Sequence, residues 1–178
     1  MTNETDIKKA FDKDKERGFR MLVDKYKESI YFYIRRMVVV HADAEDVMQE
    51  TFIRIFRGLD GFRNESNIST WIFRIATNEC IKFLERQRRT TIPTAELQNV
   101  LAEKLKATDY VDYDNVMAVK FQEALLHLPE KQQIVFNLRY YEEMDYNEIS
   151  KITGTSVDSL KTSYHYAKDK IKNYILNA

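Results

Sequence analysis

Apolar residues recur at intervals of three and four along most of this chain, which places them on one face of an α-helix. The clearest run contains Phe19, Leu22, Val23, Tyr26, Ile30, Tyr33, Ile34 and Met37. The chain has only four glycines and two prolines in 178 residues, too few for the many tight turns of a sheet protein. The sequence therefore predicts an all-α fold.

Two more helices are expected in the first half of the chain. One begins at Asp43, whose carboxylate can accept hydrogen bonds from the first turn, and ends near Gly58. Its inward residues are Ala44, Val47, Met48, Thr51, Phe52 and Ile55. The other begins at a Ser69 or Thr70 cap. Its inward residues are Ile72, Ile75, Ala76, Phe83 and Leu84. The stretch between these helices is rich in Gly, Asn and Ser and predicts a loop.

Residues 90–115 interrupt the helical pattern. Pro93 ends the preceding helix, and the run TDYVDYDN is polar and acidic without a clean period. Helical periodicity returns at Val116 and continues toward the end of the chain. We therefore expect two small helical domains, residues 1–89 and 116–178, joined by a flexible interdomain linker.

The last part of the chain has the pattern of a helix-turn-helix motif. Asp145 and Glu148 form an Asp-x-x-Glu variant of the capping box. Gly154 stands where a tight turn needs a positive φ, and Ser156 caps the final helix. A short helix, a glycine turn and a longer basic helix are typical of motifs that place the final helix in the major groove of DNA.

The charge of the chain is unevenly distributed, although 28 basic and 28 acidic residues cancel. Residues 54–89 contain eight basic and four acidic residues, and residues 90–115 contain two basic and five acidic ones. One helix face in the basic block carries Trp71, Arg74, Asn78, Lys82 and Arg86 at three- and four-residue intervals. Such a stripe suits a nucleic-acid strand, because bases stack on rings and cations contact phosphates.

No set of residues predicts catalysis. Three histidines are scattered along the chain: His41, His127 and His165. Cys80 is the only cysteine, and the sequence has no Gly-rich phosphate loop. We therefore expect no enzyme activity, no metal site and no cofactor. No N-terminal apolar run resembles a signal peptide or a membrane span, so we expect a cytoplasmic protein without membrane insertion.

Several segments occur in a specific order. The first half contains FRMLVDKYKESIYFYIRRM, DAEDVMQETFIRIFRGLDGF and STWIFRIATNECIKFLERQRR. The second half contains LLHLPEKQQIVFNLRYYEEMDYNEISKITGTSVDSLKTSYHYAKDKI. The most specific element is Asp-Ala-Glu-Asp-Val-x-Gln-Glu followed by Trp-x-x-x-Ile-Ala-x-Asn. Together these segments resemble regions 2 and 4 of the extracytoplasmic-function sigma factors, the two-domain group of the sigma-70 family.

The resemblance implies a factor that joins core RNA polymerase, recognises the minus-ten and minus-thirty-five promoter elements and promotes DNA melting. The residues that match the family's contact with the coiled coil of the largest polymerase subunit are Asp43, Asp46, Gln49, Glu50 and Ile53. A solvated helix face is the alternative interpretation of so acidic a surface. The polymerase flap and an anti-sigma factor are further implied partners.

The loop and the third helix resemble the part of the family that captures the unwound strand of the minus-ten element. The matching residues are Phe62, Arg63, Asn64, Ser66, Thr70, Trp71, Arg74, Asn78, Lys82 and Arg86. Trp71 is equally consistent with core packing. Lys82 stands where relatives commonly carry an acid, and two interpretations remain open: an added phosphate contact or an altered ion pair.

The final helix resembles the reader of the minus-thirty-five element. Its matching residues are Ser156, Ser159, Lys161, Thr162, Ser163, His165 and Lys168. Many relatives carry Arg where this chain has Ser163 and Tyr166, so weaker or differently specified binding is expected. The alternative function is a helix-turn-helix regulator or helical adaptor that does not act through core polymerase. That alternative leaves the basic stripe of the first half unexplained.

Overall fold

The computed structural model describes residues 3–62, 67–90 and 116–177 and contains no β-strand within them. In chain order its helices are α1 (Glu4–Lys13), α2 (Lys15–Met37), α3 (His41–Gly58), the 3₁₀ turn η1 (Leu59–Gly61), α4 (Ile68–Thr90), α6 (Val116–Leu126), α7 (Glu130–Phe136), the π-helical η2 (Asn137–Tyr141), α8 (Tyr146–Thr153) and α9 (Val157–Asn177). The predicted all-α fold is confirmed. Apart from Thr90, the expected linker lies outside the described residues.

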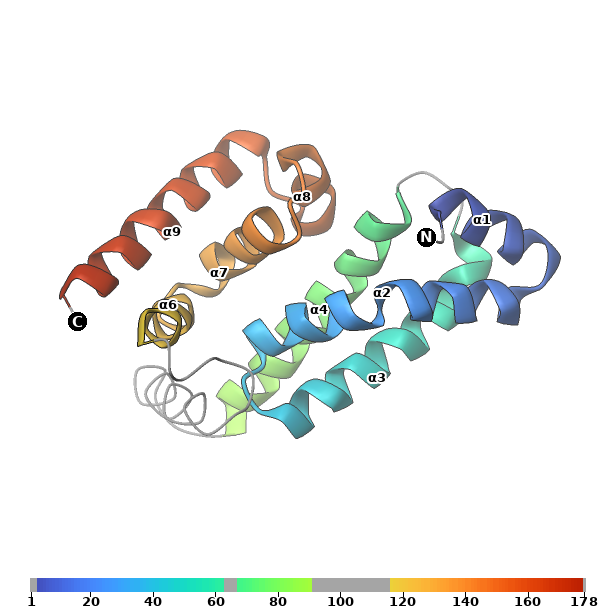
Figure 1. The fold of residues 1–178 in the computed structure, drawn as a ribbon, viewed down its shortest axis with the longest axis horizontal. Coiled ribbons are helices and arrows are strands. Elements are labelled where there is room, and N and C mark those ends of the chain that lie inside the picture. The colour runs from blue at the N-terminus through green and yellow to red at the C-terminus, as the bar shows by residue number, and fades with distance from the viewer. Residues whose placement is uncertain (1–2, 63–66, 91–115, 178) are drawn as a thin grey trace.

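Helices α2, α3 and α4 pack around one core, and α1 packs on the N-terminal part of α2 (Figure 1). The fully buried side chains of this core include Leu22, Ile30, Tyr33, Ile34, Ala44, Ile55, Ile72, Ala76 and Cys80. The apolar period of the sequence therefore identified the inward faces of all three helices. Tyr33 also exchanges a hydrogen bond of 2.7 Å with Thr77, which satisfies both buried hydroxyl groups.

The second half is built around α9, which packs on α6, α7 and α8. The predicted helix-turn-helix details are present: Asp145 and Glu148 form a reciprocal capping box, and Gly154 has a φ of 70°. Ser156 Oγ accepts a hydrogen bond from the backbone N–H of Ser159 at the start of α9. Local sequence signals therefore determine this motif.

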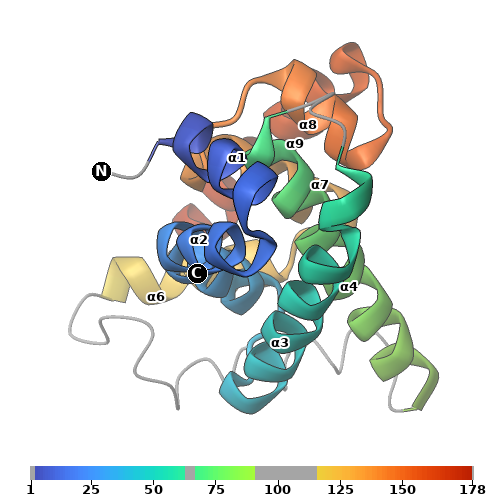
Figure 2. The same ribbon diagram turned by 90° about the vertical axis from the view of Figure 1, so that its right-hand side faces the viewer.

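The two halves are in direct contact. Helix α8 packs on α4, and the two views in Figures 1 and 2 show α7 and α8 on the side of α4 that α3 leaves uncovered. The core of the first half continues into the second through Ile134, Leu138 and Ile149, which are at most 5% exposed. An apolar interface thus joins the two halves.

The predicted starts of two helices are wrong. Helix α3 begins at His41, two residues before Asp43, and its N-cap Val40 makes no side-chain capping bond. The Asp43 carboxylate instead accepts a 3.4 Å hydrogen bond from Gln87 of α4. Helix α4 begins at Ile68, before the expected Ser69 or Thr70 cap. At α4 a tertiary contact replaces the local cap that the sequence suggested, whereas at α3 the Asp43 side chain joins a tertiary contact and no side chain caps the helix.

Helix α1 supplies the missing cap of α4. The Glu4 carboxylate accepts hydrogen bonds of 3.2 Å from the backbone N–H groups of Ile68 and Ser69, and one of 2.5 Å from the Tyr26 hydroxyl. Burial acts to raise the pKa of Glu4, but these hydrogen bonds outweigh it, and the pKa lies below its ordinary value. A carboxylate at a helix N-terminus also interacts favourably with the helix dipole.

Replacing Glu4 with alanine is expected to lower the free energy of unfolding by about 1 kcal/mol at neutral pH, because α4 loses its cap. A lowered pKa stabilises the fold above the pKa of the unfolded chain, and this contribution disappears as pH falls through the lower folded-state value. The deficit of the variant should therefore shrink in acid. Urea unfolding at several pH values measures this. Asp6→Ala, an exposed acid of the same turn, is the control, and an equal loss there would contradict the cap.

Candidate nucleic-acid interfaces

The outer face of α4 carries the predicted polar stripe. Arg74, Asn78, Lys82 and Arg86 are all exposed on this helix, because Ile72, Ala76 and Cys80 on its opposite side fill the core. Arg63, Asn64 and Ser66 lie outside the described residues. The arrangement offers three cations and one amide to a strand that runs along the helix.

Trp71 is partly buried at the start of this stripe. Its ring lies beside that of Phe62, with centroids 4.8 Å apart, and a side chain added at Gly58 would come within 3.0 Å of the indole. Trp71 therefore packs against Phe62 and the end of α3, and its side chain is only partly buried. Core packing is thus shown for part of the Trp71 ring, and its stacking on a base remains a prediction.

Thr70 departs from the expected exposure. It is only 3% exposed, and its hydroxyl donates a hydrogen bond of 3.3 Å to Glu148 at the start of α8. Asn67 donates to the same carboxylate oxygen, also at 3.3 Å. The start of α4 is therefore covered by the second half of the chain in this structure.

Buried Glu79 ties the basic stripe to α3. Its carboxylate lies 2.8 Å from Arg54 and 2.9 Å from Lys82, and only 4% of the side chain is exposed. Arg54 also pairs with Glu50 at 3.0 Å. Of the two interpretations of Lys82, the structure shows the ion pair, while the exposed ammonium group remains accessible to a phosphate. Sequence spacing within one helix gave no signal of the link to Arg54.

Four of the five predicted polymerase-contact residues line two grooves beside α3, whereas Asp43, near the start of the helix, lines neither of these grooves. Asp46 and Glu50 line a groove between α3 and α4, together with Lys82 and Arg86. Gln49 and Ile53 line an apolar groove on the other side of α3. The apolar groove also contains Phe19, Val23, Met48, Phe52, Phe56 and Arg57. Two large apolar side chains there, Ile53 and Phe56, are 44% and 36% exposed. The sequence analysis therefore identified the acidic side of α3 as a candidate contact surface. Of the apolar groove on the other side it identified only Gln49 and Ile53.

The final helix presents most of its predicted residues to solvent. Exposed are Ser156, Ser159, Lys161, Thr162, His165 and Lys168, whereas Ser163 is partly buried. Lys161 and His165 have acidic neighbours on the same helix, Asp158 at 3.9 Å and Asp169 at 3.2 Å. Exposed pairs of this kind contribute little, so DNA phosphates can compete for the basic groups. The exposed face of α9 is therefore suited to duplex DNA.

Two buried side chains that could be reactive elsewhere, Cys80 and Tyr33, are part of the core here. Burial raises the pKa of the Cys80 thiol and of the Tyr33 hydroxyl, so both stay protonated in the core. Among the described residues, no group of three or more His, Cys, Asp or Glu side chains is placed to hold a metal ion. None of the helices described has an apolar stretch long enough for a bilayer.

Two family models match the chain: sigma-70 region 2 over residues 22–90 and sigma-70 region 4 over residues 118–171. The ECF RNA polymerase sigma factor SigW of Bacillus subtilis (strain 168) is 29% identical over 175 residues, which cover 94% of each chain. The ECF RNA polymerase sigma-E factor of Escherichia coli (strain K12) is 27% identical over 172 residues, which cover 92% of this chain and 89% of that protein.

Solved structures share the fold across both halves. CnrH, solved in complex with the cytosolic domain of CnrY, has a TM-score of 0.69 and 21% identity over 96% of this chain and 94% of its own. The sigma factor RpoE, solved in complex with the anti-sigma factor NepR from Bartonella quintana, has a TM-score of 0.70 and 18% identity over 88% of this chain and 96% of its own.

Replacing Glu79 with glutamine is expected to lower the free energy of unfolding by about 1 to 3 kcal/mol, because a buried group that serves two cations loses its charge. Glu85→Gln is the matched control, since Glu85 lines the same groove but is exposed. Urea unfolding of both variants measures the difference. Equal stabilities would show that the network contributes nothing.

Proposed function

This chain belongs to the extracytoplasmic-function group of the sigma-70 family of RNA polymerase sigma factors, and from that premise we propose how its surfaces share the work of initiation. It is a transcription initiation factor and not an enzyme. The first half binds core polymerase and holds the unwound minus-ten strand. The second half reads the minus-thirty-five element as duplex.

The observation that carries this proposal is the exposed face of α4. Arg74, Asn78, Lys82 and Arg86 follow one side of the helix, and the Trp71 and Phe62 rings stand at its start. Unpaired bases stack on rings, and cations contact the phosphates between them. Stacking in duplex DNA is worth about 1.4 kcal/mol per base-pair step, so a small domain must trap extruded bases to keep the strands apart.

Helix α9 supports reading of the duplex. It follows a capped short helix and a glycine turn, and Ser159, Lys161 and Thr162 are exposed in its N-terminal half. The N-terminal residues of a recognition helix are the ones that reach base edges in the major groove. Short hydroxyl side chains and one lysine make a modest reading surface, in line with the absence of Arg at Ser163 and Tyr166.

Core polymerase is the partner that we propose for α3. The helix presents an acidic edge with Asp46 and Glu50 and an apolar edge with Ile53 and Phe56. An exposed apolar patch rimmed by charges is typical of a protein interface. We propose that the two edges bind the coiled coil of the largest subunit and that the second half contacts the flap. Both belong to the same cytoplasmic enzyme.

Anti-sigma binding is part of the proposal. A solved relative of the same fold was captured with the anti-sigma factor NepR, and the exposed apolar and basic faces of this chain are surfaces that need masking in the absence of polymerase. The domain limits that we propose remain 1–89 and 116–178, with residues 90–115 as the linker.

Changing Asp46 and Glu50 together to lysine is expected to weaken binding to core polymerase by about 2 kcal/mol or more, at least roughly thirtyfold, because the acidic edge of α3 changes sign. Titration of labelled chain with core enzyme measures the affinity. The control is Asp24→Lys with Glu28→Lys, two exposed acids of α2. A folded α3 variant with normal affinity would remove this face from the interface.

Substitutions in α9 and in α4 should impair different steps of promoter recognition. Lys161→Ala is expected to weaken duplex binding by roughly 1 to 3 kcal/mol if the lysine reaches a base edge. Arg74→Ala with Asn78→Ala should leave duplex binding near normal and suppress strand opening, because the open strand loses its polar partners. Permanganate footprinting with core polymerase reports opening, and Lys172→Ala at the far end of α9 is the control. If Lys161→Ala suppressed opening while the α4 variant weakened only duplex binding, the roles assigned to α9 and α4 would have to be exchanged.

A chain that binds duplex but opens no promoter with any core enzyme would instead fit a helix-turn-helix regulator. Transcription from a purified template with core polymerase, with and without the chain, separates the two functions directly. The sigma function requires that transcripts depend on both components.

A further inference from the structure

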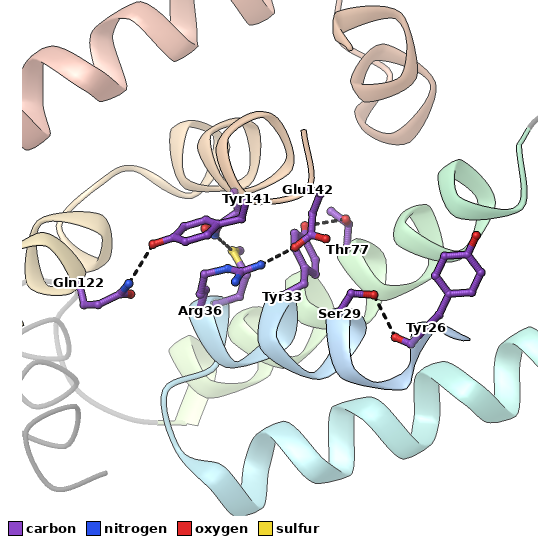
Figure 3. Close-up of polar contacts among 10 residues, drawn as sticks. Tyr26, Ser29, Tyr33, Arg36, Thr77, Gln122, Tyr141 and Glu142 are labelled. Carbon is purple, nitrogen blue, oxygen red and sulfur yellow. Dashed lines mark hydrogen bonds and ion pairs between the residues drawn. The ribbon is translucent and has the colours of Figure 1, made fainter. Parts of the chain in front are cut away.

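One buried ion pair joins the two halves of the chain. The Arg36 guanidinium of α2 pairs with the carboxylate of Glu142, which follows η2, and the two side chains are only 8% and 11% exposed (Figure 3). The Tyr141 ring lies 4.0 Å from the same guanidinium, and the Arg36 carbonyl accepts a 3.2 Å hydrogen bond from Gln133. Glu142, Tyr141 and Gln133 all belong to the second half, so these contacts of Arg36 cross between the two halves.

The buried charges of Arg36 and Glu142 stabilise the structure only while both are present. Removing one member of a buried pair leaves the other without compensation, and this is strongly destabilising. Among the described residues, Arg36 Nε and Asn137 Oδ1 are already buried without a hydrogen-bond partner. Burial raises the pKa of the Glu142 carboxyl, although the neighbouring Arg36 charge opposes this shift. Loss of either charge should therefore destabilise the contact between the two halves.

The segment that carries Glu142 has an unusual backbone. Residues Asn137–Tyr141 form a π-helix at the end of α7, and Glu143 has a φ of 54°, in the left-handed region that residues other than glycine seldom adopt. Conformations of this kind persist when surrounding contacts impose them, and they cluster at switch segments. Around this turn Arg139 donates a hydrogen bond of 2.9 Å to the Met144 carbonyl, and Arg36 pairs with Glu142, the residue before Glu143.

We propose that Arg36, Tyr141 and Glu142 form a latch, named here for these three residues, which holds the free sigma factor in a closed and inactive arrangement. The proposal rests on the proposed function and adds its regulation. Glu148 supports the closed state at the other end of the interface, where it accepts hydrogen bonds from Asn67 and Thr70 at the head of the minus-ten surface.

The closed arrangement is too small for a promoter. The minus-ten and minus-thirty-five elements are about 25 base pairs apart, which is about 85 Å of duplex at about 3.4 Å per step. A compact chain of this length has a radius of gyration of about 16 Å. The two halves must therefore part before both elements are read.

The test is a distance between the two halves of the full free chain. Spin labels on Asp24→Cys in α2 and Asn173→Cys in α9 report it by pulsed electron resonance, since both positions are exposed and native Cys80 is buried. The wild type should give a single narrow distribution. Glu142→Gln should raise the ratio of open to closed chains about tenfold. Glu143→Gln, the exposed neighbouring acid with the same change of charge, should leave the distribution unchanged.

Helical content by circular dichroism shows whether Glu142→Gln remains folded, and Arg36→Lys replaces it if it does not, because lysine keeps the charge but loses the fork geometry of the guanidinium. Unchanged distances in the folded variant would overturn the latch and leave the apolar contact as the cause of closure.

A second readout tests inhibition. The opened variant should give open promoter complexes at a roughly tenfold lower concentration of chain with core polymerase. If the two halves of the variant separate but promoter complexes form at the same chain concentration as with the wild type, the inhibitory role is overturned. The distances need no polymerase, so failure of the latch is distinguishable from failure of the sigma function, in which neither wild type nor variant would support transcription.

Discussion

Packing of α4 on three sides decides what the molecule can present to a promoter. Its apolar residues Ile72, Ala76 and Cys80 are fully buried against α2 and α3, while α8 packs on its beginning. Only one face of α4 then remains exposed to solvent. Because the helix repeats every 3.6 residues, Arg74, Asn78, Lys82 and Arg86 all lie on that face. The surface that we propose to face DNA is thus a consequence of core formation. A shift of α4 in the core would displace the whole stripe at once.

The buried charge of Glu79 makes α3 and α4 act as one surface. Its carboxylate serves Arg54 on one helix and Lys82 on the other, and Arg54 in turn pairs with Glu50 on the acidic edge. A charge so little exposed is held firmly only if its partners stay in place. A polymerase contact at Glu50 and a phosphate contact at Lys82 therefore bear on the same carboxylate. The two proposed functions of the first half share one electrostatic network.

Signals within a few residues could be read from the sequence, and contacts between distant segments could not. The Asp145 capping box and the Gly154 turn depend on neighbours in the chain, and both are present as predicted. The cap of α4 comes from Glu4, more than sixty residues away, so Ser69 gave a misleading start. The exposure of the stripe was readable from periodicity. The Arg36 contact was not, because no local pattern pairs α2 with the segment after η2.

The interface between the halves combines apolar surface with buried charge, and the two parts do different things. Ile134, Leu138 and Ile149 extend the core and favour closure without fixing one geometry. The Arg36 and Glu142 pair fixes the register, because a buried charge has few acceptable partners. Parting breaks both the apolar contact and the ion pair, but it leaves neither charge buried without a partner, because water solvates both groups in the separated state. An interface of this composition is specific when closed and still able to open, as a factor with two distant DNA elements requires.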